Sequence, residues 1–234
     1  RDRDQVYSNF DGGLLNLAGI MVADARKLNA FDYEMGKARW LALNGKWNDR
    51  FFLNEMTRED YKEAATFLQE KLTDKVIDEA MLAFPTEVMA YSLEKEDIDG
   101  KLKKRREQML DFAMDYYDHL AKVVTVNATN KDDVLRATAL ENGNLLVQLF
   151  DADKKGEADE KFFERTFHFP ETREVRLYGM DGDDRFELFG DRNSKIRLRL
   201  IGGTDGDKVD AQGKLAAKIY DGRDGMKIEG NKGK

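Results

Sequence analysis

An aspartate–glycine turn between β-branched and aromatic residues recurs along the second half of this chain, and it constrains the fold more than any other feature. Copies span residues 178–186, 201–209 and 220–228, and residues 128–134 form a degenerate relative. Self-similarity at a period of roughly 20–25 residues is typical of stacked, solenoid-like β architectures. The repeat therefore indicates the fold of this half more directly than its function.

The first half of the chain, residues 12–123, has a helical pattern of apolar residues. Thr57 and Asp60, three residues apart, predict a capping box at the start of one helix, and Thr73 precedes a second. Leu68 and Val76 are among the residues expected to face inward. The longest helix is predicted over residues 97–122, and the aromatic-rich residues 35–56 are predicted to be a loop packed on the helices.

After Val123 the apolar pattern changes to a period of two, which is typical of strands with one buried face. Residues 134–140 and 145–151 flank Asn142-Gly143, a pair that predicts a hairpin, and a third strand follows over residues 162–169. The expected fold class is therefore α+β, with helices first and strands second. We predict an N-terminal helical bundle (residues 1–122), then an all-β domain (residues 123–234) with an antiparallel meander and a short β-solenoid-like Asp/Gly repeat.

Composition and charge exclude several classes of function. The 234 residues carry a net charge of −7 spread along the chain, which argues against nucleic acid as a partner. The absence of cysteine excludes disulfides, zinc thiolate sites and cysteine nucleophiles. No apolar run approaches the roughly 18–20 residues needed to span a bilayer, so no transmembrane segment is expected. The chain begins without an initiator methionine, and we expect it to be part of a longer protein.

Residues 1–8 read Arg-Asp-Arg-Asp-Gln-Val-Tyr-Ser. They resemble the Pro-Arg-Asp-Arg-Asp-Gln-Ala-Phe-Ser element of large envelope proteins of Gram-negative bacteria. Stretches that agree in order and approximate spacing are residues 72–78 with Phe84-Pro85, then Arg105-Arg106, and then residues 172–179 with 201–203. Proteins of that family carry an N-terminal calcineurin-like metallophosphoesterase domain and a C-terminal outer-membrane assembly-type β-barrel. The resemblance implies that this chain is the middle region between them.

The resemblance also implies a metal-binding role for the first residues. In that family the element matching residues 1–5 follows an Asp-Arg-His motif like that of atypical secreted and lipid-type kinases. By this interpretation Asp4, or less favourably Asp2, would hold Mg²⁺ against ATP phosphates, and residues up to Lys122 would be the back of a kinase C-lobe. The alternative is that these alternating charges form a surface ion-pair ladder of little energetic value. In either case we expect no catalytic residues within this chain, and its cofactor-binding residues are unknown.

The Asp/Gly turns raise a second metal hypothesis. Calcium requires six to eight oxygen ligands, and stacked turns rich in carboxylates could supply them. The candidate ligands are Asp181, Asp183, Asp184, Asp205 and Asp207. Aspartate and glycine also dominate tight turns because they tolerate the left-handed backbone, and we favour that structural interpretation over calcium.

Two functions from different classes are consistent with these features. The first is a non-catalytic structural or interaction module of a cell-envelope protein, on the periplasmic or surface side of the outer membrane, with the adjacent phosphoesterase-type domain and barrel as partners. The second is the C-terminal part of an atypical kinase-like phosphotransferase, with Mg²⁺ bound in the intact parent protein. We expect the first for this chain.

Overall fold

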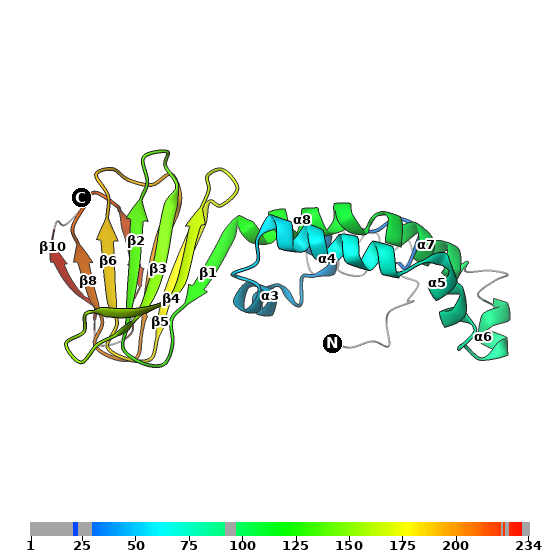
Figure 1. Cartoon of the computed structure of the whole chain (residues 1–234), viewed down its shortest axis with the longest axis horizontal. Coiled ribbons are helices and arrows are strands. Elements are labelled where there is room, and N and C mark those ends of the chain that lie inside the picture. Colours follow the sequence, from blue (N-terminus) through cyan, green and yellow to red (C-terminus); the bar gives the residue numbers. More distant parts are fainter. Residues whose placement is uncertain (1–20, 23–29, 92–96, 221, 223–224, 231–234) are drawn as a thin grey trace. The chain divides into compact units, whose positions relative to one another are not determined.

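The computed structural model describes residues 21–22, 30–91, 97–220, 222 and 225–230 (Figure 1). The chain divides into two compact units, Arg1–Trp47 with Met56–His119 and Asn48–Glu55 with Leu120–Lys234. The first unit contains most of the helices, and the second contains the strands. The domain boundary at residues 122 and 123 stays a prediction.

The helices are short, and their caps follow local sequence signals. They are α2 (Ala38–Leu41), α3 (Lys46–Phe52), α4 (Arg58–Lys71), α5 (Asp74–Met81), α6 (Thr86–Tyr91), α7 (Ile98–Glu107) and α8 (Met109–Ala121). The capping box before α4 is confirmed: the Thr57 side chain accepts from the Asp60 amide, and the Asp60 carboxylate accepts from the Thr57 amide at 2.6 Å. Thr73 caps α5 by accepting from the Val76 amide.

Two predictions about the helical half are wrong in detail. The helix predicted over residues 97–122 is divided at Gln108 into α7 and α8. The Gln108 side chain donates to the Tyr33 carbonyl and accepts from the Met35 amide, both at 2.9 Å, so the break coincides with a long-range contact. The loop predicted over residues 35–56 contains α2 and α3, and Phe52 at the end of α3 is 75% exposed.

The predicted helical bundle is also wrong. Of the residues expected to face inward, Leu68 is 45% exposed and Val76 is 41% exposed. Burial in the described helices is confined to scattered positions such as Ile77 and Met81. Polar contacts also link the helices. Gln69 donates to the Arg106 carbonyl at 2.9 Å, and Arg106 donates to Asp74 at 2.7 Å.

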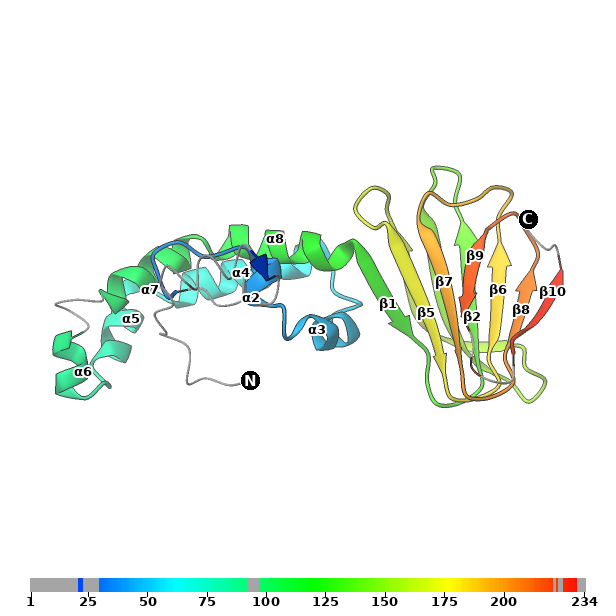
Figure 2. The ribbon, with the colours of Figure 1, turned by 180° about the vertical axis from the view of Figure 1, so that it is seen from behind.

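The strands form two sheets. They are β1 (Val123–Asn127), β2 (Asp133–Ala139), β3 (Leu145–Ala152), β4 (Ala158–Phe167), β5 (Glu174–Met180), β6 (Arg185–Phe189), β7 (Arg197–Gly203), β8 (Lys208–Ala211), β9 (Ala217–Tyr220) and β10 (Lys227–Gly230). One sheet has the order β1-β5-β7-β9 and is parallel throughout (Figure 2). The other has the order β10-β8-β6-β2-β3-β4 and is mixed.

The predicted fold class is therefore wrong. Antiparallel pairing is confined to β2, β3 and β4, where β2 and β3 flank the Asn142-Gly143 turn, and every other pairing is parallel. The chain is mixed α/β, with one parallel and one mixed sheet, rather than a helical bundle followed by an antiparallel meander and a β-solenoid-like domain. Alternation of apolar and polar residues predicts strands, but it does not determine their partners, and here those partners are distant in sequence.

The repeated turns occupy equivalent positions in neighbouring strands. Leu177 pairs with Leu200, which pairs with Ile219, and on the other sheet Phe186 pairs with Val209, which pairs with Ile228. In-register parallel pairing places like residues of successive copies side by side. Self-similarity in the sequence thus reflects repetition of the same backbone environment.

The hydrophobic core lies between the inner faces of the two sheets. Its fully buried side chains include Leu135, Phe186, Leu177 and Leu200. On the four-stranded sheet these residues alternate with outward-facing polar ones, as in the burial pattern of β7.

We expect the substitution Leu200→Ala to lower the free energy of unfolding by about 2–5 kcal/mol, because it leaves a cavity at a side chain that is 0% exposed. Urea denaturation measures the effect. Leu82→Ala removes the same atoms from a side chain that is 71% exposed and should change stability by less than about 0.5 kcal/mol. Equal effects of the two substitutions would contradict the described core.

Candidate functional site

A ladder of buried aspartates connects successive turns beside β2, β6 and β8. Asp184 Oδ1 accepts a hydrogen bond from the Asp133 amide at 2.9 Å, and Asp207 Oδ1 accepts from the Asp184 amide at 3.1 Å. All three aspartates are nearly fully buried. The Asp184 and Asp207 carboxylates each satisfy a backbone N–H of the preceding turn, so the ladder fixes the stacking of the turns.

The second oxygens of the ladder have different surroundings. Asp133 Oδ2 accepts from the Thr129 amide at 2.7 Å, and Asp207 Oδ2 accepts from the Gly203 amide at 2.9 Å. Asp184 Oδ2 is buried and has no hydrogen-bond partner among the described residues. A Cβ atom at Gly179 would lie 2.2 Å from this oxygen, so only glycine leaves room for the Asp184 carboxyl group.

Burial raises the pKa of Asp184 to about 8. The hydrogen bond from the Asp133 amide opposes this effect, whereas the negative charges of Asp207, Asp133 and Asp132 add to it. Burial is less costly for the neutral form of a carboxyl group than for its charged form. At neutral pH the central carboxyl group of the ladder is therefore protonated.

The other predicted calcium ligands also bond to neighbouring turns. Asp183 accepts from the Gly206 amide at 2.9 Å, Asp205 accepts from the Gly182 amide at 3.1 Å, and Asp181 accepts from the Thr204 hydroxyl at 3.0 Å. Within the described ranges, no group of three or more His, Cys, Asp or Glu side chains could hold a metal ion. The calcium hypothesis, which we rank below the structural interpretation, stays untested, and the contacts that the structure does show are structural.

The magnesium candidates Asp2 and Asp4 lie outside the described residues.

The outward face of the four-stranded sheet is strongly cationic, a feature that sequence analysis missed. Arg176 of β5, Arg199 of β7 and Lys218 of β9 are direct cross-strand neighbours, and Arg197 is the partner of Glu174. We call these five residues the basic face. The alternation of apolar and basic residues at 196–200 predicts a strand with one solvent-exposed face. It does not show that cationic side chains of three strands lie next to one another.

Glu174 is the one carboxylate of the basic face. Its side chain is only 2% exposed. Its oxygens lie 2.7 Å from Arg176 Nε, 3.1 Å from Arg199 Nη2 and 3.3 Å from Arg197 Nη2. Burial by itself would raise the pKa of Glu174, but the hydrogen bonds from Arg176 and Arg199 outweigh it and lower the pKa below its ordinary value. Glu174 is therefore ionised at neutral pH.

The outward face of the six-stranded sheet is balanced in charge. Arg136 bonds to Glu187 at 2.8 Å, and Arg185 bonds to Asp210 at 3.2 Å. Each arginine thus has an acidic neighbour on an adjacent strand. The excess of cations on the four-stranded sheet is therefore local, in a chain whose net charge is −7.

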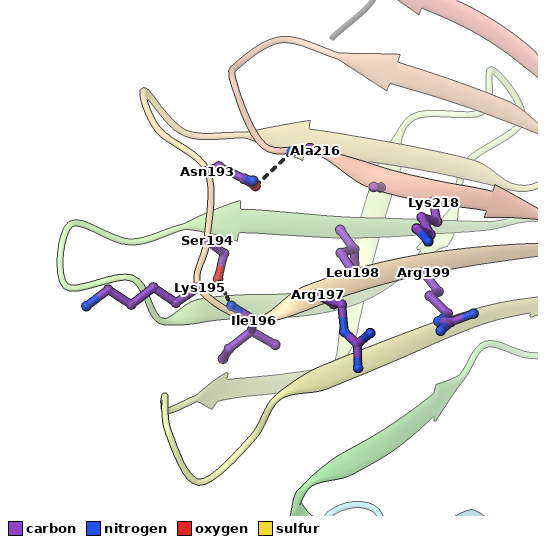
Figure 3. Close-up of a pocket in the computed structure, with 10 residues that line it drawn as sticks. Asn193, Ser194, Lys195, Ile196, Arg197, Leu198, Arg199, Ala216 and Lys218 are labelled. Carbon is purple, nitrogen blue, oxygen red and sulfur yellow. Dashed lines mark hydrogen bonds between the residues drawn. The ribbon is translucent and has the colours of Figure 1, made fainter. Parts of the chain in front are cut away.

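A surface pocket of about 220 Å³ lies at the edge of the basic face, beside the first residues of β7 and β9 (Figure 3). A hydrogen bond of 3.1 Å from the Ala216 amide to the Asn193 side chain joins its two walls. The Ser194 hydroxyl accepts from the Ile196 amide at 3.0 Å. These contacts fix the backbone that carries Arg197.

Comparisons of the chain with models of known protein families, with curated proteins and with solved structures give no significant match. In the part of the chain that the structure describes, every helix is too short or too polar to cross a membrane. The resemblance to envelope proteins and the functions it implies therefore stay predictions.

The neutral Asp184 carboxyl group predicts how stability depends on pH. The folded state keeps the proton up to pH about 8, whereas the unfolded chain releases it near pH 4. The contribution of Asp184 is fully present below pH 4 and is lost as pH rises to about 8. We expect Asp184→Asn, which mimics the neutral acid, to remove this part of the pH dependence. The measurement is urea denaturation of both proteins at several pH values from 4 to 9.

Asp191→Asn is the matched control, because Asp191 is exposed. It should leave the pH dependence of stability parallel to that of the unsubstituted protein. If Asp184→Asn and the unsubstituted protein have parallel curves across this range, Asp184 is ionised in the folded state and the described ladder is wrong at its centre.

Glu174→Gln should destabilise the protein by about 3 kcal/mol, because it leaves three arginines around a buried neutral group. Thermal and urea denaturation at pH 7 measure the loss. Glu164→Gln on β4 removes a carboxylate that is 46% exposed from its pair with Lys161, and should cost less than about 1 kcal/mol. Similar losses from both substitutions would show that Glu174 has no special role.

Proposed function

We propose that this chain is a non-catalytic structural and interaction module of a larger cell-envelope protein of a Gram-negative bacterium, linking a phosphoesterase-type domain to an outer-membrane β-barrel. The identity of the flanking domains rests on the sequence resemblance at residues 1–8, 72–78 and 172–179. The linking role has support from the edges of the two sheets.

The observation that carries the linking role is the pair of edge strands β9 and β10. β9 is the last strand of the four-stranded sheet, and β10 is the last of the six-stranded sheet beside β8. Both are parallel to their inner neighbours, and they carry exposed apolar side chains, with Tyr220 43% exposed and Ile228 47% exposed. An edge strand has unpaired N–H and C=O groups that can pair with another segment.

The occupant that we propose for this edge is the part of the same protein that leads into the barrel. A segment that pairs with β9 and β10 would extend each of the two sheets beyond its present last strand. It would also cover Tyr220 and Ile228. The module would then join the barrel through backbone hydrogen bonds and an extended core, which makes a rigid connection rather than a flexible linker.

The kinase-like alternative depends on Asp2 and Asp4. Since both lie outside the described residues, no contact in the structure favours that alternative.

The edge proposal predicts a difference in amide hydrogen exchange between this chain and a longer protein that includes the barrel. Amides of β9 and β10 should exchange more slowly in the longer protein. A segment paired with these strands would hydrogen-bond N–H groups that are otherwise exposed to water. Mass spectrometry of peptides covering Ala217–Tyr220 and Lys227–Gly230 measures the effect.

The inner strand β7 is the internal control, because it is already paired with β5 and β9. Its peptides should exchange at the same rate in both proteins. Equal exchange of β9 and β10 in the two proteins would show that nothing covers this edge and would reject the linking role as proposed.

A further inference from the structure

The pocket beside β7 and β9 has an excess of positive charge at its lining. Arg197, Arg199 and Lys218 all line it. Figure 3 shows Arg197 and Arg199 projecting from the same side of β7, with Lys218 on the neighbouring strand. The three cationic groups thus come from two adjacent strands and are held at a spacing set by the sheet rather than by a mobile loop.

The described acidic groups do not neutralise these cations. Glu174 shares its single negative charge among Arg176, Arg197 and Arg199. Arg199 contacts Glu174 and also donates to the Tyr220 hydroxyl at 2.7 Å. Lys218 has no ion-pair partner among the described residues, and the Arg197 side chain, 67% exposed, contacts Glu174 at one nitrogen only, at 3.3 Å. Arg197 and Lys218 therefore keep donors that a ligand can use.

The fourth cation at the pocket is not available in the same way. The Lys195 ammonium lies 5.7 Å from the centre of the Phe169 ring. Its side chain extends away from Arg197 and Arg199 in Figure 3. We therefore assign Lys195 no part in ligand binding.

The excess charge favours a dianion over a monoanion. A phosphate monoester carries a charge of about −1.5 to −2 at pH 7 and has three acceptor oxygens, whereas a carboxylate carries −1 and has two. Arginine matches phosphate oxygens with two parallel N–H donors, and lysine adds a point charge. A volume of about 220 Å³ accommodates a phosphate group with a short organic substituent.

We propose that the pocket beside β7 and β9 binds the phosphate group of a small, soluble phosphate monoester, with Arg197 and Lys218 as its direct ligands. Arg199 is a positioning residue, because Glu174 and Tyr220 each accept a hydrogen bond from it and hold its guanidinium group in place, and its charge raises the local positive potential. The hydrogen bond from the Ala216 amide to the Asn193 side chain joins the two walls of the pocket. The inference is independent of the linking role, which concerns the edges of β9 and β10.

The experiment is titration of the folded chain with glycerol 3-phosphate, followed by calorimetry and by amide NMR shifts, at constant ionic strength and pH 7.5. We expect saturable binding with shifts concentrated at residues 193–199 and 216–218. Arg197→Ala and Lys218→Ala should each weaken binding about ten-fold or more, because each removes a charge-assisted hydrogen bond. Lys208→Ala, which removes an exposed cation from the six-stranded sheet, should leave the affinity unchanged.

Further comparisons separate this site from general charge attraction. Glycerate, which presents a carboxylate of similar size, should bind at least ten-fold more weakly than glycerol 3-phosphate. Lys218→Glu should abolish binding while the thermal midpoint stays close to that of the unsubstituted protein, since Lys218 is exposed.

Three results would overturn the proposal. The first is an equal affinity for glycerate and glycerol 3-phosphate, and the second is an equal loss of affinity in Lys208→Ala and Lys218→Ala. The third is binding to vesicles of phosphatidate in phosphatidylcholine with no saturable binding of glycerol 3-phosphate, which would assign the basic face to a membrane surface. None of these results depends on whether β9 and β10 become covered in the longer protein.

Discussion

In-register parallel pairing of successive strands is the constraint on which the strand-rich unit depends. β5 pairs with β7, and β6 pairs with β8, so that equivalent residues of each copy lie side by side. The same register places Asp184 where its carboxylate accepts from the Asp133 amide, and Asp207 where its carboxylate accepts from the Asp184 amide. A slip of one residue would turn the buried row outward and separate these aspartates from their donors.

The same register also produces the charge distribution. Arg176, Arg199 and Lys218 become neighbours because their strands are adjacent, and like charges placed opposite one another destabilise a sheet. Glu174 offsets part of this cost by contacting three arginines from a buried position. The positive charge that Glu174 does not neutralise can attract an anion. The basic face is thus a consequence of the way the strands stack, and the proposed anion site rests on the positive charge that this stacking leaves without acidic partners.

Predictions from sequence succeeded where the signal and the structure it determines are close together in the chain. The capping box at Thr57 and Asp60 and the turn at Asn142-Gly143 each involve only a few residues. Predictions failed where a distant partner decides the outcome. The break at Gln108 coincides with contacts to residues about 73 and 75 positions away, and the parallel pairing of β2 with β6 joins residues 51 positions apart.

The features of the candidate site can be divided in the same way, into those that local sequence predicts and those that depend on distant partners. The sequence by itself determined the turns, the alternation of apolar and basic residues at 196–200, and the repetition of aspartates, because each is visible in the order of residues along the chain. Only the tertiary structure decided that Asp184 is buried without a partner for one oxygen, and that Arg197 and Lys218 line one pocket. The physical reason is that burial and charge accumulation depend on which strands become neighbours. No single copy contains that information.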